Sequence, residues 1–326
     1  MRAIIPVAGV GSRLRPHTYT LPKVLLTVAG KPILGHIVDK IKAEGIREAT
    51  VIVGHMGDKI FDFLTKSYPE FKFDFVEQED RMGLGHAIYL SRHTFSTDPI
   101  FIILGDTIFD VSLAGVLSGP TSAIGVKVVD DPRRFGVAVV ENDYIVQLVE
   151  KPEKPMSRLA MVGLYFIRQP ALLTSCLEEI VSKDIRTKGE YQLTDALQLM
   201  ITRGEKMKTF PVDGWYDCGK PETLLATNRA LLTQTHSTPP GVPGVVINQP
   251  VYVAPSALLS NCVIGPFASV GDHAEISEAV VRNSIISQGA RVSRVLLDNS
   301  IIGNDSVVTG SYKRFNVGGS SEIETD

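Results

Sequence analysis

Cysteine is scarce in this sequence, with 3 residues among 326. Cys176, Cys218 and Cys262 lie far apart and form no CxxC pair. Their odd number and wide spacing argue against a disulfide framework and against a zinc site, and they indicate reduced thiols. We therefore expect a cytoplasmic protein.

Long apolar runs and an excess of one charge are also lacking. Ile100–Leu104 is a typical apolar run, far below the roughly 20 residues that a membrane helix needs. Residues 2–8 are too short and too lightly charged for a signal peptide. The 33 basic and 36 acidic residues give a formal charge of −3, without the basic excess of a dedicated nucleic-acid binder. We expect a globular protein of about two domains whose partners include neither a membrane nor a nucleic acid.

Acidic residues are absent from the first 38 positions, which hold five basic residues. These are Arg2, Arg13, Arg15, Lys23 and Lys31. A chance run of solvated side chains is one explanation of this pattern. The run contains glycines and prolines instead of a helical pattern, however, which favours a binding site for a polyanion.

Lysine is absent from residues 237–312, where small and β-branched residues prevail. A segment rich in proline and glycine comes directly before this change and has the composition of a linker. The sequence therefore predicts four parts: a domain over 1–236, a linker over 237–247, a second domain over 248–312 and a flexible tail over 313–326.

Short apolar runs alternate with helical patterns in the first domain. The order predicts an α/β fold with a Rossmann-like, mainly parallel sheet and helices on both faces. The strands of its first half are expected at 3–7, 49–53, 71–76 and 100–104, and the helices at 32–43, 58–66 and 86–93. A more antiparallel stretch is expected at 122–129, 136–140, 144–149 and 160–167, and further helices at 171–182, 191–202 and 220–235.

An internal repeat follows the linker. Residues 277–292 align without a gap on residues 293–308, and residues 261–276 fit the same frame more loosely. Aliphatic residues recur at 264, 270, 276, 280, 286, 292, 296, 302 and 308, which are steps of six, six and four. This period predicts a short C-terminal parallel β-helix with three strands per coil and about three coils. Ordinary β-hairpins are the alternative, but they have no fixed repeat.

A glycine loop follows the first predicted strand. Gly9 and Gly11 leave backbone N–H groups that can approach a nucleotide closely. A dinucleotide-binding loop is the alternative, but Leu14 stands where its fingerprint requires glycine. The surplus of positive charge suits a triphosphate better than the diphosphate of NAD.

At this loop the sequence resembles the sugar-1-phosphate nucleotidyltransferases, also called nucleotide-sugar pyrophosphorylases. Their signature, Gly-x-Gly-[Ser/Thr]-Arg followed by Pro-Lys, stands here as residues 9–13 and 22–23. Residues 6–9 are similar to the uridylyltransferases, and residues 14–16 to the thymidylyl and guanylyl branches, so the base stays open. The resemblance implies that the nucleotide is bound by Ala8, Gly9, Gly11 and Ser12, and that Arg13 and Lys23 are catalytic.

The resemblance continues with a base-reading glutamine and two aspartate motifs. It implies that Gln78 and Gly83 contact the nucleobase, although a surface glutamine before a helix is the alternative for Gln78 alone. Leu104-Gly105-Asp106 places a carboxylate just past an apolar strand, where ligands bind in open α/β sheets. Asp217 follows the only tryptophan by two residues, and the resemblance implies that Asp106 and Asp217 hold Mg²⁺.

Further motifs resemble the sugar-phosphate pocket of the family. The resemblance implies sugar or phosphate contacts from Gly136, Glu150, Lys151, Gly163 and Glu190, with Lys151 also counted as catalytic. A solvated strand end is the alternative for Glu150 and Lys151 as a pair. The matching motifs extend from residue 6 to residue 219 and keep the order of the family.

The resemblance implies that a nucleoside triphosphate and a sugar 1-phosphate are converted to a nucleotide sugar and pyrophosphate. It favours dTTP or UTP with glucose 1-phosphate, a Mg²⁺ cofactor, a left-handed β-helix, and a homo-oligomer formed through the catalytic domain, the β-helix or both. Guanylyl transfer to mannose 1-phosphate and a non-catalytic regulatory subunit of the same fold stay open. A nicotinamide dehydrogenase and an acyltransferase using His273 are more remote alternatives.

Overall fold

The computed structural model describes residues 1–234, 241–314, 316–320 and 322, which fall into two compact units. Unit 1 comprises Met1–Thr27 and Lys31–Thr227, and unit 2 comprises Val28–Gly30 and the chain from Asn228 onward. The expected boundary at residue 236 and the beginning of the expected linker, residues 237–240, lie outside the described residues.

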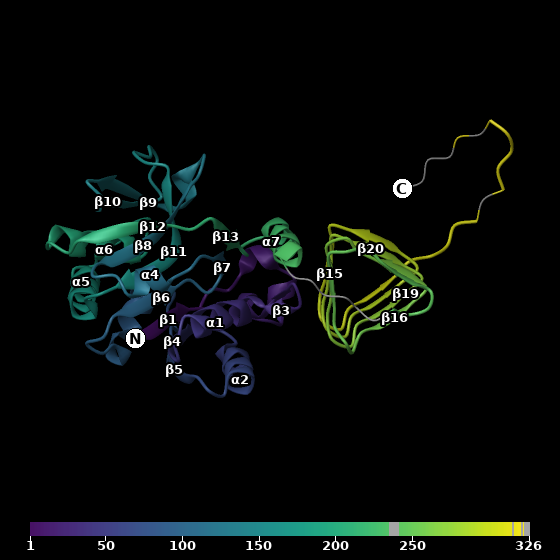
Figure 1. Cartoon of the computed structure of the whole chain (residues 1–326), viewed down its shortest axis with the longest axis horizontal. Helices are drawn as coiled ribbons and strands as arrows, with labels where there is room; N and C mark the ends of the chain where they lie inside the picture. Colours follow the sequence, from purple (N-terminus) through teal and green to yellow (C-terminus); the bar gives the residue numbers. More distant parts are fainter. Residues whose placement is uncertain (235–240, 315, 321, 323–326) are drawn as a thin grey trace. The chain divides into compact units, whose positions relative to one another are not determined.

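Unit 1 is built on a nine-stranded sheet (Figure 1). The order along the sheet is β10-β9-β11-β6-β1-β4-β5, with β8 paired to β11 and β12 paired to β8. The strands are β1 (Arg2–Pro6), β4 (Glu48–Val53), β5 (Lys72–Glu77), β6 (Ile100–Ile103), β8 (Ser122–Val128), β9 (Gly136–Glu141), β10 (Tyr144–Glu150), β11 (Leu159–Ile167) and β12 (Met207–Pro211). The strands β4, β1 and β6 run parallel, whereas β11 runs antiparallel to β6, β8 and β9. The predicted α/β class, with parallel strands before an antiparallel stretch, is confirmed.

The described residues form seven α-helices, six of them at or near the predicted places and one short helix, over 114–117, that the sequence analysis did not predict. They are α1 (Ile33–Ala43), α2 (Gly57–Ser67), α3 (Leu84–Leu90), α4 (Ala114–Leu117), α5 (Pro170–Ser182), α6 (Leu193–Thr202) and α7 (Pro221–Gln234). Buried residues of α3, α5 and α6 share one core with Ile4 and Ile102 of the sheet. Ile5 and Phe101 are equally buried but lie outside this core, because neighbouring residues of a strand point to opposite faces. The alternation explains why the central residues of these strands are apolar without a break.

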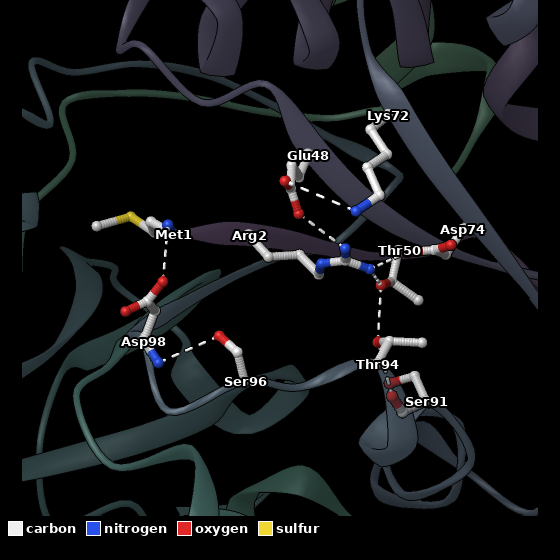
Figure 2. A network of polar contacts seen from close by, with 10 residues as sticks. All are labelled: Met1, Arg2, Glu48, Thr50, Lys72, Asp74, Ser91, Thr94, Ser96 and Asp98. Carbon is white, nitrogen blue, oxygen red and sulfur yellow. Dashed lines mark hydrogen bonds and ion pairs between the residues drawn. The ribbon is translucent and has the colours of Figure 1, made fainter.

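A polar network ties together the amino ends of three strands of the sheet (Figure 2). The guanidinium of Arg2 on β1 donates to Glu48 on β4 at 2.8 Å and also pairs with Asp74 on β5. Thr50 accepts from the same guanidinium and is hydrogen-bonded to Thr94 at 2.8 Å. The Arg2 side chain is only 13% exposed, so these contacts are partly shielded from solvent. Arg2, one of the five early basic residues, therefore serves the fold at the edge opposite the glycine loop.

Unit 2 consists of stacked parallel strands with three strands per coil. Its three sheets have the orders β14-β17-β20-β23, β15-β18-β21-β24 and β16-β19-β22-β25. The strands are β14 (Val245–Ile247), β15 (Val251–Val253), β16 (Leu258–Ser260), β17 (Cys262–Ile264), β18 (Ala268–Val270), β19 (Glu275–Ser277), β20 (Val280–Arg282), β21 (Ile285–Ile286), β22 (Arg291–Ser293), β23 (Leu296–Asp298), β24 (Ile301–Ile302) and β25 (Val307–Thr309). The arrangement is consistent with the predicted left-handed β-helix.

The β-helix has one coil more than the repeat predicts, because the first coils are longer. Val251 pairs with Ala268, seventeen residues on, whereas Ile285 pairs with Ile301, sixteen residues on. The extra residue falls in the turns that contain Pro250 and Pro266. A gapless sixteen-residue frame therefore fits the last coils and misses the first.

Candidate functional site

The glycine loop lines a cavity of about 480 Å³ at the carboxyl ends of the parallel strands. The loop follows β1, where a parallel sheet places its ligands. Ten of the residues singled out from the sequence line this cavity: Ala8, Gly9, Gly11, Ser12, Arg13, Lys23, Gln78, Gly83, Asp106 and Glu190. They come from segments spread over more than half of the chain, and the fold brings them to one place.

The two loop glycines differ in what surrounds them. Gly11 has a φ of +65°, and a Cβ there would lie 2.9 Å from the Cβ of Lys23. Gly9 has no atom within 4 Å of the position that a Cβ would take, although it lines the cavity. Gly11 is therefore required by the fold of the loop, whereas the space at Gly9 is open to a ligand.

Lys23 reaches the cavity from a short 3-10 turn, η3 (Lys23–Leu25), in which all three residues are buried. Its Nζ lies 2.7 Å from Oδ2 of Asp106, and its side chain is only 9% exposed. The ammonium group is thus held beside a carboxylate inside the cavity, where it can contact a bound phosphate without further burial.

Two strands that the sequence analysis missed bring the two predicted metal ligands together. The strand β7 (Thr107–Asp110) pairs antiparallel with β13 (Gly214–Asp217), so Asp217 lies opposite Thr107. The N–H of Cys218 donates to the carbonyl of Asp106 at 3.1 Å. The predicted tryptophan turn is therefore the end of a strand, and it sets Asp217 next to Asp106.

The two neighbouring carboxylates of Asp106 and Asp217 are suited to binding a divalent cation. Burial raises the pKa of Asp217, and the neighbouring charge of Asp106 raises it further, while Lys23 and Arg13 act in the opposite direction. Two carboxylates that repel each other in a partly buried site provide hard oxygen ligands for Mg²⁺. Among the described residues there is no cluster of three or more acidic, histidine or cysteine side chains suited to a metal. Phosphate oxygens and waters would have to complete the coordination.

The residues predicted to contact the base, Gln78 and Gly83, line the cavity together with the start of α3. A Cβ on Gly83 would lie 2.6 Å from the carbonyl oxygen of Tyr191, and one on Gly85 would lie 2.8 Å from the same atom. The N–H of Gly85 donates to that carbonyl at 2.7 Å. The two glycines are therefore needed because this turn packs directly on the backbone before α6.

The predicted sugar residues form a second group around Glu150. The Oε2 atom of Glu150 accepts from the hydroxyl of Thr194 at 2.7 Å, and its Oε1 atom lies 3.2 Å from Nζ of Lys151. A Cβ on Gly136 would lie 3.0 Å from Glu150 Oε2. Gly136, Glu150 and Lys151 are thus brought together, and Glu190 lines the cavity itself.

Gly163 lies apart from this carboxylate group and packs against the strand that leads to Asp106. Its φ is +86°, and its carbonyl accepts from the N–H of Leu104 at 3.0 Å. Leu104 and Gly105 line the cavity. The structure therefore shows a packing role for Gly163. Its contact with the sugar phosphate stays a prediction.

Sequence reasoning missed some residues that belong to the site. Arg81 lines the cavity beside Gln78 and adds another positive charge. Thr194 holds Glu150, and Asp195 keeps a buried Oδ2 atom without a hydrogen-bond partner among the described residues. Burial raises the pKa of Asp195. The sequence predicts only a helix at 191–202 here, and the hydrogen bond to Glu150 on β10 is what places Thr194 beside the predicted sugar residues.

Comparisons with known proteins agree with this geometry. The nucleotidyl transferase family matches residues 2–234. A glucose-1-phosphate thymidylyltransferase of Streptomyces antibioticus is 30% identical over 99% of this chain and 99% of its own length. The UTP–glucose-1-phosphate uridylyltransferase AglF of Haloferax volcanii is 34% identical over 72% of this chain and 98% of its own length. The bifunctional protein GlmU of Methanocaldococcus jannaschii is 34% identical over 95% of this chain and 72% of its own length.

Solved structures show the same relationship. The crystal structure of a putative glucose-1-phosphate thymidylyltransferase from Bacillus anthracis, in complex with a sucrose, superposes with a TM-score of 0.63 at 30% identity, covering 73% of this chain and 98% of that chain. No helix among the described residues is long and apolar enough to span a membrane. The chain belongs to the nucleotidyl transferase family and is an enzyme of the sugar-1-phosphate nucleotidyltransferase type.

Proposed function

We propose that this enzyme transfers a nucleotidyl group from dTTP or UTP to glucose 1-phosphate, with release of pyrophosphate. The observation that carries the proposal is the convergence of Arg13, Lys23 and Asp106 on one cavity at the carboxyl ends of the parallel strands. Relatives named for thymidylyl and uridylyl transfer to glucose 1-phosphate support the choice of substrates. Cytoplasmic location and assembly into a homo-oligomer remain predictions from the sequence.

The chemistry needs no nucleophile from the protein. An oxygen of the sugar phosphate attacks the α-phosphorus in line, a new P–O bond forms, and the bond to pyrophosphate breaks. Both reactants are anions, so the enzyme must align them and offset the charge on the leaving group. Arg13 and Lys23 line the cavity and would neutralise this charge, and the backbone of Ala8, Gly9, Gly11 and Ser12, which also line it, would surround the phosphates.

Asp106 and Asp217 would hold Mg²⁺, which when bound neutralises phosphate charge. In the protein alone, Lys23 already pairs with Asp106, so this lysine offsets part of the charge of the site. Lys151 would hold the attacking phosphate and Glu150 would accept from sugar hydroxyls. Their pairing at 3.2 Å holds the two groups next to each other.

Measuring pyrophosphate release tests the proposal. Each of dTTP, UTP, ATP, GTP and CTP is paired with glucose, mannose, galactose and N-acetylglucosamine 1-phosphates. We expect dTTP or UTP with glucose 1-phosphate to give the highest kcat/KM. Preference for GTP with mannose 1-phosphate would contradict the substrate assignment, and no turnover with any pair would favour a regulatory subunit.

Two substitutions test the assigned residues in the same assay. Lys23→Ala and Asp106→Asn should each lower kcat by more than about tenfold, which corresponds to a barrier change of about 1.4 kcal/mol. Lys66→Ala and Asp62→Asn serve as matched controls, because these residues form an exposed ion pair on α2. Rates of the first two variants within tenfold of the wild type would remove Lys23 and Asp106 from the mechanism.

A further inference from the structure

The side-chain amide of Gln78 is held by two acceptors. Its Nε2 donates to the carbonyl oxygen of Gly83 at 3.1 Å and lies 3.3 Å from Nδ1 of His86. Gln78 is only 6% exposed, yet it lines the cavity. The orientation of the Gln78 amide therefore decides whether a hydrogen-bond acceptor or a donor faces the cavity at this point.

These contacts allow one orientation of the amide. A carbonyl oxygen only accepts hydrogen bonds, so the amide atom that faces Gly83 must be the nitrogen. The second N–H of the same nitrogen is then directed at His86, whose Nδ1 must accept. The nitrogen of Gln78 is fully used, and no described residue donates to its Oε1.

The surroundings of His86 suit a neutral ring that accepts at Nδ1. The residue is 6% exposed, and its ring lies near those of Tyr89 and Tyr191, with centroid distances of 6.4 Å and 6.2 Å. Burial lowers the pKa of His86, and the charge of Arg186 acts in the same direction, whereas the charge and backbone of Asp80 act against them. Because Nδ1 must accept from Gln78, a neutral ring carries its proton on Nε2, the nitrogen that faces away from Gln78.

We propose that His86 is a positioning residue that, together with the Gly83 carbonyl, fixes the Gln78 amide so that Oε1 faces the nucleobase. An acceptor at this point selects a base with a ring N–H, such as uracil or thymine. It disfavours cytosine, whose ring nitrogen at the same position is itself an acceptor. The inference rests on the proposed function, since it assigns the base end of the cavity to the nucleotide, and it adds how the specificity is set.

Binding of nucleotides to the full-length protein tests this role without turnover. Titration calorimetry with UTP, dTTP and CTP, in the absence of sugar phosphate, gives the ratio of their dissociation constants. His86→Phe keeps an aromatic ring near the two tyrosines but removes the acceptor. We expect the preference for UTP over CTP to fall about tenfold, the effect of one lost hydrogen bond.

His86→Asn is the matched variant, because its side-chain oxygen can replace Nδ1 as an acceptor. We expect it to recover most of the preference for UTP. Equal weakening of UTP and CTP in His86→Phe, or a ratio within about twofold of the wild type, would show a merely structural role and overturn the inference. Wild-type protein that binds CTP as tightly as UTP, or binds neither, would overturn it as well.

Two further measurements keep the outcomes distinct. The nitrogen NMR signals of His86 in the wild type, assigned by comparison with His86→Asn, should show an unprotonated Nδ1 and a protonated Nε2; a protonated Nδ1 would overturn the inference even if His86→Phe failed to fold. Pyrophosphate release by the wild type is measured in parallel. Its absence would reject the proposed reaction, whereas normal turnover with an unchanged base preference in His86→Phe would reject only the role of His86.

Discussion

At the residue scale, glycines that look alike in the sequence have different tasks in the structure. Gly11, Gly83 and Gly85 are each required by a neighbouring backbone or side chain less than 3 Å from the position that a Cβ would take. Gly9 has no such neighbour and borders the open cavity. The family resemblance implied site roles for Gly9, Gly11 and Gly83 but not for Gly85, and the distinction between packing and ligand contact depends on tertiary neighbours.

Gly9→Ala should therefore affect the ligand and spare the fold. We expect stability to stay equal or rise by up to about 1 kcal/mol, because alanine restricts the unfolded chain. The KM for the nucleoside triphosphate should rise about tenfold or more, because the methyl group occupies ligand space. Thermal denaturation and steady-state kinetics measure the two effects. Gly115→Ala on the exposed helix α4, also without a neighbour within 4 Å, is the control, and an unchanged KM in Gly9→Ala would place the phosphates elsewhere.

The ion pair between Arg2 and Glu48 makes a prediction about pH. The hydrogen bond from Arg2 holds the pKa of Glu48 below its ordinary value of 4.5. The carboxylate therefore adds stability above about pH 4.5, and this contribution is lost as the pH falls through the lower pKa of the folded state. Because Glu48 is 45% exposed, we expect Glu48→Gln to cost less than about 1 kcal/mol at pH 6, with the difference shrinking toward pH 3.

Urea denaturation of the wild type and Glu48→Gln between pH 3 and pH 7 measures this difference. Glu141→Gln is the control, since Glu141 is exposed at the end of β9 and forms no ion pair with a described residue. A difference between wild type and Glu48→Gln that stays constant with pH would mean that the carboxylate contributes through packing alone.

At the element scale, apolar runs predicted the long strands but not the pair that completes the site. The strands β1, β4 and β6 are buried along most of their length and are mostly apolar, so they are easily found in the sequence. The strands β7 and β13 have four residues each and pair across about a third of the chain. Neither strand shows a hydrophobic pattern that identifies it in the sequence, because each is short and is stabilised by pairing with the other. The proximity of Asp106 and Asp217 was therefore inferred from family resemblance and not from pattern.

A bulge in β11 is the second feature of this scale that bears on activity. The register between β11 and β8 shifts between Met161 and Tyr165, around Gly163 with its φ of +86°. A Cβ at Gly163 would lie 2.8 Å from Cγ of Leu104, at the end of β6. The bulge thus positions the segment that leads to Asp106.

Gly163→Ala should lower both stability and turnover. Alanine at a positive φ costs about 1 kcal/mol or more, and the clash with Leu104 adds about 1–3 kcal/mol. The shifted Leu104 should also lower kcat. Gly204→Ala is the matched control, because Gly204 has a φ of +94° with no atom within 4 Å of its Cβ position. Equal losses of stability in the two variants would show that the contact with Leu104 does not matter.

At the scale of the whole molecule, each of the two units contains an apolar core of its own among the described residues. The core of unit 1 joins α3, α5 and α6 to the sheet, and that of unit 2 lies inside the stacked coils. No residue belongs to both cores. The change in composition after residue 236 indicated two domains, because a β-helix core needs small and β-branched residues whereas a doubly covered sheet needs larger aliphatic ones. The cavity assigned to the reaction lies entirely within unit 1.

Because each unit has a core of its own, we expect a destabilising substitution in one core to lower the thermal stability of that unit and to leave the other unit unchanged. Ile286 in the β-helix is 1% exposed and Ile102 in the sheet is fully buried, so Ile286→Ala and Ile102→Ala should each cost about 2–5 kcal/mol in their own unit. In differential scanning calorimetry we expect Ile286→Ala to lower one transition and Ile102→Ala the other. Below both transitions, kcat of Ile286→Ala should stay within about twofold of the wild type, because none of the described residues that line the cavity belongs to its core. A single transition that moves equally in both variants would instead mean that the β-helix and the catalytic unit unfold as one, and that the β-helix stabilises the enzyme throughout.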